Sequence, residues 1–129
     1  GTGREPIVDV DDIAEVAAAA LTEERHSGQL YELTGPELLG FDQAAAALGE
    51  AIGREVRYLP ITLEQFHASM TEIGGAFIAD VFTGICREVL DGRNESLADG
   101  VQRALGREPR SFAAFCRKAA ASGAWRQAA

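Results

Sequence analysis

The N-terminal half of the chain alternates short extended segments with helical ones, and this alternation restricts it to an α/β architecture. Residues 6–10 alternate apolar and polar side chains, as a strand with one buried face does. An apolar run at helical spacing follows as far as about Thr22, and an Ala-rich helical stretch occupies 43–52. Residues 29–34 and 55–60 again have the composition of strands, which gives three short strands in all.

Polar residues and glycines mark where the helices of this half begin and end. Asp11 or Asp12 is expected to cap the first helix, and Asp42 the helix at 43–52, because a short carboxylate accepts from the free N–H groups of a first turn. Gly53 follows the second helix as a C-terminal stop.

The C-terminal half is predicted to be helical throughout. Thr62 and Gln65 have capping-box spacing, and the helix that they begin is broken by Gly74-Gly75. Residues 76–90 form a second amphipathic helix. Its apolar stripe is Phe77, Val81, Ile85 and Val89. Two more helices, at 98–105 and at 112–121 behind a Ser111 cap, bring the expected total to about six.

Bulk composition excludes several classes of function. A net charge of -8 argues against nucleic-acid binding, and no apolar run approaches the roughly 20 residues of a membrane span. Cys86 and Cys116 lack ligand or disulfide spacing, which favours a reducing, cytoplasmic setting. Asp9, Asp11 and Asp12 resemble part of a calcium loop but lack its central Gly and closing Glu, so no metal site is expected.

Three stretches of sequence resemble one known family. They are Val8–Ala14 (VDVDDIA), Tyr31–Pro36 (YELTGP) and Leu105–Phe115, which reads LGREPRSFAAF. In this order they resemble the C-terminal portion of the NmrA-like, atypical short-chain dehydrogenase/reductases. The resemblance implies the substrate-side lobe of a Rossmann-type reductase, in which strand 29–34 completes the Rossmann sheet and strands 6–10 and 55–60 pair within the small lobe.

The resemblance also implies that the parent protein uses NAD(P) and that this chain alone binds none. A member of the family holds the dinucleotide on a Gly-rich loop between a strand and a helix. Gly1-Thr2-Gly3 has no strand before it, and Gly74-Gly75 lies between helices. Neither Tyr31 nor Tyr58 has the Lys of a Tyr-x-x-x-Lys pair. No catalytic or cofactor-binding residue is therefore assigned, and the chain, which begins without Met, reads as the middle of a longer protein whose N-terminal Rossmann domain is missing here.

The C-terminal lobe of such enzymes shapes the pocket over the nicotinamide, which implies substrate-binding residues on the helices after the third strand. The candidates are Phe66, His67, Met70, Phe77 and Phe82. An aromatic and thioether lining suits flat apolar substrates such as quinones. The alternative is that these side chains are core residues and that His67 is a surface or capping histidine. His26, in a polar loop, is expected to be solvated.

The expected function of the parent is NAD(P)H-dependent reduction of a small substrate. Two alternatives stay open: an NAD(P)-sensing regulator without catalysis, and a freestanding helical interaction module. A sugar-nucleotide epimerase is disfavoured by the NmrA-like tail. Because strand 29–34 lacks its neighbour in this chain, the chain is also expected to self-associate.

Overall fold

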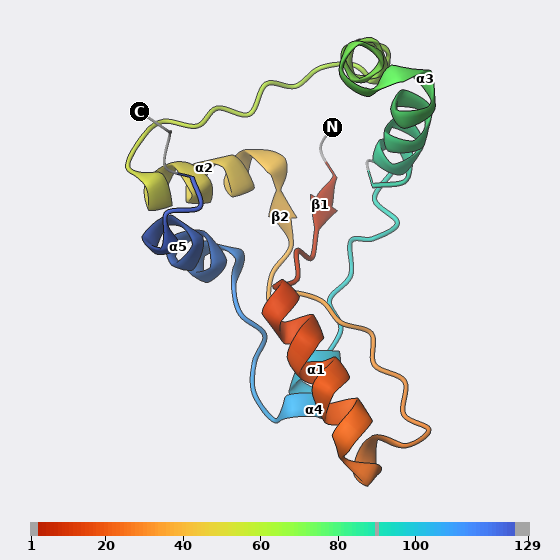
Figure 1. Cartoon of the computed structure of the whole chain (residues 1–129), viewed down its shortest axis with the longest axis vertical. Helices are drawn as coiled ribbons and strands as arrows, with labels where there is room; N and C mark the ends of the chain where they lie inside the picture. The colour runs from red at the N-terminus through yellow and green to blue at the C-terminus, as the bar shows by residue number, and fades with distance from the viewer. Residues whose placement is uncertain (1–2, 90, 126–129) are drawn as a thin grey trace.

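The computed structural model describes residues 3–89 and 91–125. Its elements are β1 Arg4–Glu5, α1 Val10–Thr22, the 3-10 turn η1 Glu24–His26, β2 Leu39–Gly40, α2 Phe41–Ile52, α3 Leu63–Val89, α4 Gly100–Leu105 and α5 Phe112–Ser122 (Figure 1). The chain is therefore mostly helical, with a small antiparallel sheet in which Arg4 pairs with Gly40 and Glu5 with Leu39.

Helix α1 packs on α4. Its buried Val16 and Ala19 lie on one face, and the buried Val101 and Ala104 of α4 supply the opposing small apolar surface. The helix is capped by Asp9, whose carboxylate accepts from the Asp11 N–H at 2.8 Å. The expectation of a cap at Asp11 or Asp12 was therefore wrong. The helix starts at Val10, inside the predicted strand 6–10, because the Asp9 cap lies two residues earlier than expected.

Asp12 has a different role: it anchors α1 to the segment that leads into α5. Its carboxylate is fully buried and accepts from the Arg107 guanidinium and from the Arg110 backbone N–H, each at 2.7 Å. The Arg110 side chain also donates to it. Both arginines reach Glu15 one turn further along α1. The arginines of the LGREPRSF stretch thus fix where the last helix begins.

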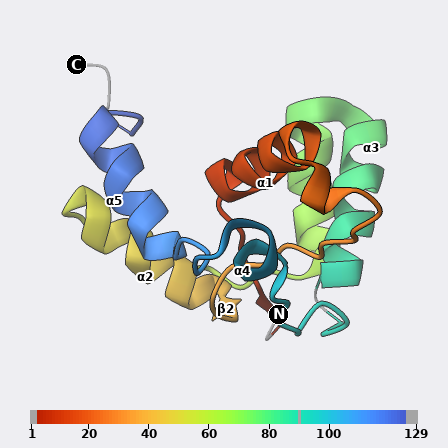
Figure 2. The same cartoon turned by 90° about the horizontal axis from the view of Figure 1, so that it is seen from below.

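Helices α1 and α4 form one packing unit, and helices α2 and α5, which lie side by side, form the second. Helix α3 lies on the other side of α1 and α4 (Figure 2). The Ser111 hydroxyl caps α5 by accepting from the Ala114 N–H at 3.2 Å, as predicted. The start of α2 differs from the prediction. Gly40 rather than Asp42 is its cap residue, and its N–H donates to the Gln43 side chain at 2.9 Å.

None of the predicted strands 6–10, 29–34 and 55–60 is a strand in this structure, which corrects that prediction. The predicted pairing of 6–10 with 55–60 is absent from the described residues, and β1 pairs with β2 instead. A strand requires a continuous hydrogen-bonded neighbour, and each segment meets only isolated partners. The Thr34 hydroxyl accepts from the Ala98 N–H at 3.0 Å and donates to the Ala98 carbonyl at 3.1 Å. Beyond it, the Gly35 N–H donates to the Pro6 carbonyl at 3.0 Å. Residues 55–60 run as an exposed connection between α2 and α3.

His26 is buried, contrary to the expectation that it would be solvated. Its Nδ1 lies 2.8 Å from the Tyr31 hydroxyl, and the two rings meet edge to face. The aromatic partner comes from the extended segment after η1, so this histidine fixes the end of α1 against residues 29–34.

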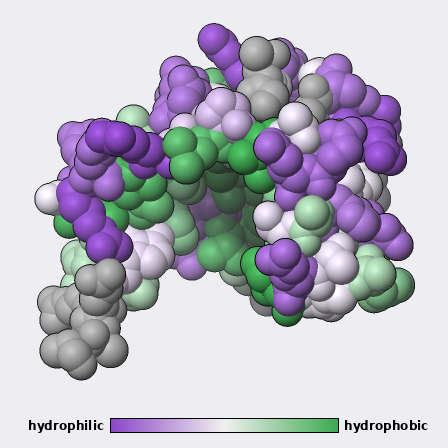
Figure 3. Space-filling model, turned by 90° about the horizontal axis from the view of Figure 1, so that it is seen from above, coloured by the Kyte–Doolittle hydropathy of each residue, from purple (hydrophilic) through white to green (hydrophobic). Residues whose placement is uncertain are grey.

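The chain exposes more surface than its mass requires. Its accessible area is 8622 Å², whereas a folded monomer of 13.7 kDa exposes about 6600 Å². Helix α3 stands away from the two packing units (Figure 1). Viewed from above, hydrophobic side chains surround a hollow in the face of the molecule (Figure 3). No helix in the described ranges is both long and apolar enough to cross a bilayer.

Candidate functional site

The candidate site is on α3, which consists of two helical halves joined by a kink. Thr62 begins the first half with the predicted capping box: its hydroxyl accepts from the Gln65 N–H at 3.2 Å, and the Gln65 side chain accepts from the Thr62 N–H at 2.9 Å. Gly75 has φ 81° and ψ 171°, which no helix contains. That left-handed φ favours glycine, so the Gly74-Gly75 break is confirmed and sets the angle between the halves.

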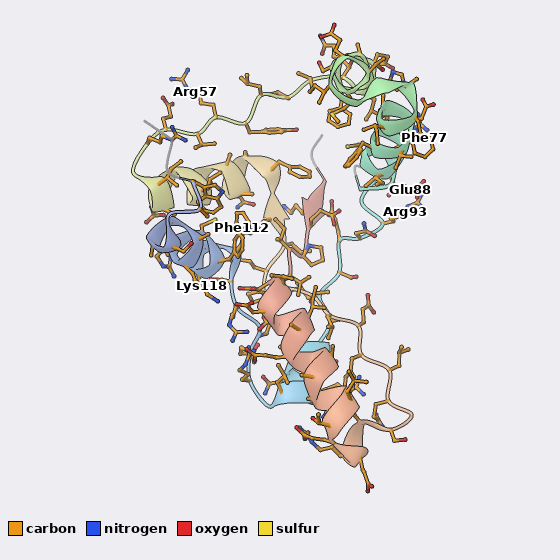
Figure 4. All side chains as sticks on the ribbon, viewed as in Figure 1. Arg57, Phe77, Glu88, Arg93, Phe112 and Lys118 are labelled. Carbon is orange, nitrogen blue, oxygen red and sulfur yellow. The ribbon has the colours of Figure 1, made fainter. Side chains whose placement is uncertain are left out.

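The second half of α3 presents an apolar face to solvent. Phe77 is 77% exposed and, like Val81 and Ile85, belongs to the predicted stripe at four-residue spacing. Phe82 beside this stripe and Ile73 before the kink are exposed as well. Figure 4 labels Phe77 on this half of the helix. Large apolar side chains gathered on one element are typical of a surface that binds a ligand or a protein.

The five predicted substrate residues all lie on α3, divided between its two halves. Phe66, His67 and Met70 are half-buried on the first half of the helix, whereas Phe77 and Phe82 are exposed on the second. His67 lines a pocket together with Leu63, Glu64, Thr83 and Arg87. Their role in binding substrate stays a prediction.

His67 has an acidic partner that the sequence did not reveal. Its Nε2 lies 2.9 Å from Asp80 Oδ1, across the kink at Gly75. The two residues are 13 positions apart, so helical spacing alone cannot bring them together, and only the angle at the kink does so.

A second carboxylate, that of Glu64, lies at the same pocket and is held in its anionic form. Hydrogen bonds from its own backbone N–H and from the Thr62 hydroxyl, with the positive charge of Arg87, lower the pKa of Glu64.

A second cleft, of about 480 Å³, lies where the 53–62 connection passes β1, β2 and the start of α2. Its aromatic wall is a stacked pair, Phe41 and Tyr58, whose ring centroids are 6.0 Å apart at an interplanar angle of 24°. Arg4, Asp42 and Gln43 supply polar groups. The sequence gives no signal for this cleft, because its walls come from three segments that only the fold brings together.

Of the two Gly-containing stretches noted in the sequence, Gly1-Thr2-Gly3 lies outside the described residues except for Gly3. The helix that follows β1 is α1, and its first turn is already capped by Asp9 and carries the carboxylates of Asp11 and Asp12. The Asp9 side chain thus occupies one of the N–H groups that a pyrophosphate would use, and the other two carboxylates are paired with Lys118, Arg107 and Arg110. The Gly74-Gly75 pair lies within α3 and follows no strand. The described residues also contain no group of three or more acidic, His or Cys side chains placed to hold a metal ion.

Known proteins provide an independent comparison. No family model matches the chain. It is 40% identical to the NAD(P)H azoreductase of Xenophilus azovorans, over 95% of this chain and 43% of that protein. It is 35% identical to the oxidoreductase YesF of Bacillus subtilis, over 89% of this chain and 41% of the other. The chain thus spans about two fifths of the length of these relatives.

Solved structures agree with the sequence comparison. The triphenylmethane reductase of Citrobacter sp., crystallised with NADP(H), superposes with a TM-score of 0.80 at 25% identity, over 92% of this chain and 42% of that one. The NADPH-dependent quinone oxidoreductase of Escherichia coli gives a TM-score of 0.73 at 24% identity, over 92% and 43% of the two chains. This second likeness is one of fold alone.

Proposed function

We propose that the chain is the substrate-side lobe of an NAD(P)H-dependent reductase. The premise is that almost its whole length corresponds to the C-terminal portion of the NmrA-like, NAD(P)-binding reductases. The observation that carries the proposal is the 40% identity with the azoreductase over 95% of this chain. The predicted C-terminal resemblance to such reductases is confirmed.

We propose a flat aromatic compound as the substrate. The names of the relatives specify an azo compound, a triphenylmethane and a quinone, and the azo and quinone groups are planar conjugated systems. The exposed aromatic and aliphatic side chains of α3 have the chemistry to stack on such a molecule. Phe66, His67, Met70, Phe77 and Phe82 remain the residues proposed to contact it, in a pocket that a second domain completes.

The cofactor of the whole protein is NAD(P)H in this proposal, and it supplies the hydride. We propose that residues outside this chain hold it, since Asp9 already caps the start of α1 and the Gly74-Gly75 pair lies inside a helix. This division fits the neighbouring structure that contains NADP(H), of which the chain spans 42%.

The proposed partner of the chain is therefore the Rossmann domain of the same protein. The excess surface of about 2000 Å² over a compact monomer of this mass is sufficient for a domain interface. Without that domain, the apolar face of α3 and the segment 29–34, which lacks a strand neighbour, favour self-association. Neither nucleic acid nor a membrane is proposed as a partner, and a reducing cytoplasm stays our prediction for the compartment.

The test is a fluorescence titration with NADPH and NADH on the 129-residue chain and on its complete reading frame. We expect the longer protein to bind and the chain alone not to bind. Turnover of 1,4-naphthoquinone and an azo dye by the longer protein then tests the reduction itself. Binding by the chain alone, or by neither protein, refutes the proposal that residues outside this chain hold the cofactor. Tight binding without turnover of any such substrate favours the regulatory alternative.

A further inference from the structure

Helix α3 belongs to neither packing unit of the fold. The main helix–helix packings join α1 to α4 and α2 to α5, and α3 stands apart from both (Figure 1). The exposed connection 55–60 leads into it, and a turn at 91–94 follows it. The angle between its two halves is therefore set mainly by residues of the helix itself.

The backbone provides a pivot for this angle at Gly75. Its φ of 81° lies in the left-handed region, and a Cβ at this position would meet no atom within 4 Å. One residue earlier the space is filled, because the Ile78 side chain lies 2.9 Å from where a Cβ of Gly74 would be. Glycine has the widest choice of backbone angles, so Gly75, with open space beside it, is the residue at which the angle can change.

One pair of side chains bridges the pivot. His67 Nε2 in the first half lies 2.9 Å from Asp80 Oδ1 in the second, and no other side-chain hydrogen bond or ion pair among the described residues joins the two halves. The side chains are 40% and 74% exposed. An exposed pair of this kind changes the ratio of two conformations by up to about 5-fold. The link is therefore strong enough to bias the angle and too weak to lock it.

The angle decides how the candidate substrate residues are arranged. Phe66 and Met70 lie on the first half of α3, and Phe77 and Phe82 lie on the second. A single flat molecule can contact both sets only when the halves stand at a suitable angle.

We propose that His67 and Asp80 form a latch that holds the halves of α3 at the angle at which both sets of side chains meet one substrate. In this role both are positioning residues, and neither needs to touch the substrate. The substrate part of the inference rests on the proposed function, whereas the latch rests on the bridged pivot.

The latch should weaken as the pH rises. Histidine ordinarily changes its charge between about pH 5 and pH 8. When protonated, His67 forms an ion pair with Asp80, and when neutral it keeps only a hydrogen bond. In the described part of the chain, the charged groups beside His67 are Asp80, Glu64 and Arg87. The latched fraction should therefore be highest at low pH and fall as His67 loses its proton.

The first test measures the distance across the pivot in the full-length protein, without substrate. Nitroxide labels at Ala68→Cys and Glu88→Cys, both exposed positions, report it by double electron–electron resonance. Cys86 and any accessible thiol outside this chain are replaced by Ser, and Cys116 is fully buried. Between pH 5.5 and pH 8.5 we expect the ratio of latched to open populations to fall by up to about 5-fold. Asp80→Ala should show the open population at every pH.

The second test measures binding by the same full-length protein without labels. Asp80→Ala should bind 1,4-naphthoquinone up to about 5-fold more weakly in equilibrium dialysis, because affinity falls with the latched fraction. NADPH affinity should not change. The reversed pair, His67→Asp with Asp80→His, keeps the link but moves the imidazole, and it should restore both the distance and the naphthoquinone affinity.

Glu55→Ala is the matched control. It removes an exposed ion pair, that of Glu55 with Arg57 at 2.7 Å, which lies outside α3. Neither the distance across the pivot nor the affinity for naphthoquinone should change.

Three results overturn the inference. The first is an unchanged distance in Asp80→Ala, and the second is an altered distance with unchanged naphthoquinone affinity. The third is a reversed pair that restores the distance but not the affinity, which would show that His67 acts by touching the substrate. Failure of the unaltered protein to bind either NADPH or naphthoquinone refutes the proposed function instead, and the distance measurement still decides whether the latch exists.

Discussion

Replacement of Asp12 by Asn tests how the last helix is held in place. Asp12 is fully buried and accepts from Arg107 and Arg110. The Asn side chain keeps the shape of the carboxyl group but loses its charge and turns an NH₂ group toward two guanidinium groups. Arg107 and Arg110 then remain beside an uncharged, partly mismatched partner.

The expected loss is about 3 kcal/mol in the free energy of unfolding. Breaking a buried ion pair by removing one partner costs about 3–5 kcal/mol. The lower value applies because the two arginines are one-third exposed, at 34% and 33%, and water stabilises them when the carboxylate is gone. For a domain of this size, 3 kcal/mol lowers the melting temperature by roughly 10 °C.

The effect should depend on pH in a defined direction. Burial by itself raises the pKa of Asp12, but hydrogen bonds from Arg110 and Arg107 outweigh burial and hold that pKa below its ordinary value. A carboxyl group whose pKa is lower in the folded state contributes stability above the pKa of the unfolded chain, near 4, and loses it as the pH falls through the folded-state pKa. The wild-type advantage over Asp12→Asn should therefore be full at pH 7 and shrink below about pH 4.

Thermal unfolding followed by circular dichroism between pH 3 and pH 7 measures both effects. Glu15→Gln is the matched control, because Glu15 accepts from the same two arginines but has a side chain that is 45% exposed. Its melting temperature should fall less than that of Asp12→Asn. Equal losses in the two variants, or a pH-independent difference for Asp12→Asn, would show that the buried carboxylate is not the anchor.

Three further substitutions test other parts of the structure. Gly75→Ala forces alanine to φ 81° and should lower the free energy of unfolding by about 1–2 kcal/mol. Urea denaturation measures this loss, and an unchanged midpoint would show that residue 75 does not need a positive φ. Ser111→Ala removes the cap of α5 and should cost about 1 kcal/mol, again from the urea midpoint, with Ser111→Thr as the retained-cap control. Phe77→Ser changes a side chain that is 77% exposed, so the melting temperature should not change. Sedimentation velocity should show less self-association of the chain, and undiminished association would exclude the α3 face as its cause.

Helices were largely predictable from the sequence because their signals are local. The capping box at Thr62, the kink at Gly75 and the Ser111 cap each involve residues within a few positions, and all three appear as predicted. The strands were not predictable in the same way. An alternating pattern indicates that a segment suits a sheet, but the ladder needs a neighbour, and segments 29–34 and 55–60 have only isolated partners here.

The site shows the same limit. The sequence predicted the two halves of α3 and the apolar stripe that includes Phe77, but not that this stripe is exposed. It gave no partner for His67, because Asp80 reaches it only through the kink. The stacked pair of Phe41 and Tyr58 joins segments that the fold alone brings together.

The second domain that we propose would account together for the failed strands, the excess surface and the exposed α3 face. The segment 29–34 is anchored by Thr34 to Ala98 and has no ladder partner among the described residues. The accessible area is some 2000 Å² above that of a compact protein, which is sufficient for a domain interface. The relatives extend well beyond the two fifths of their length that this chain spans. If the corresponding residues of the longer protein cover these surfaces, amide hydrogen exchange at 29–34 should be markedly slower in the full reading frame than in the 129-residue chain. Equal exchange rates in the two proteins would show that the proposed domain does not cover the backbone at 29–34.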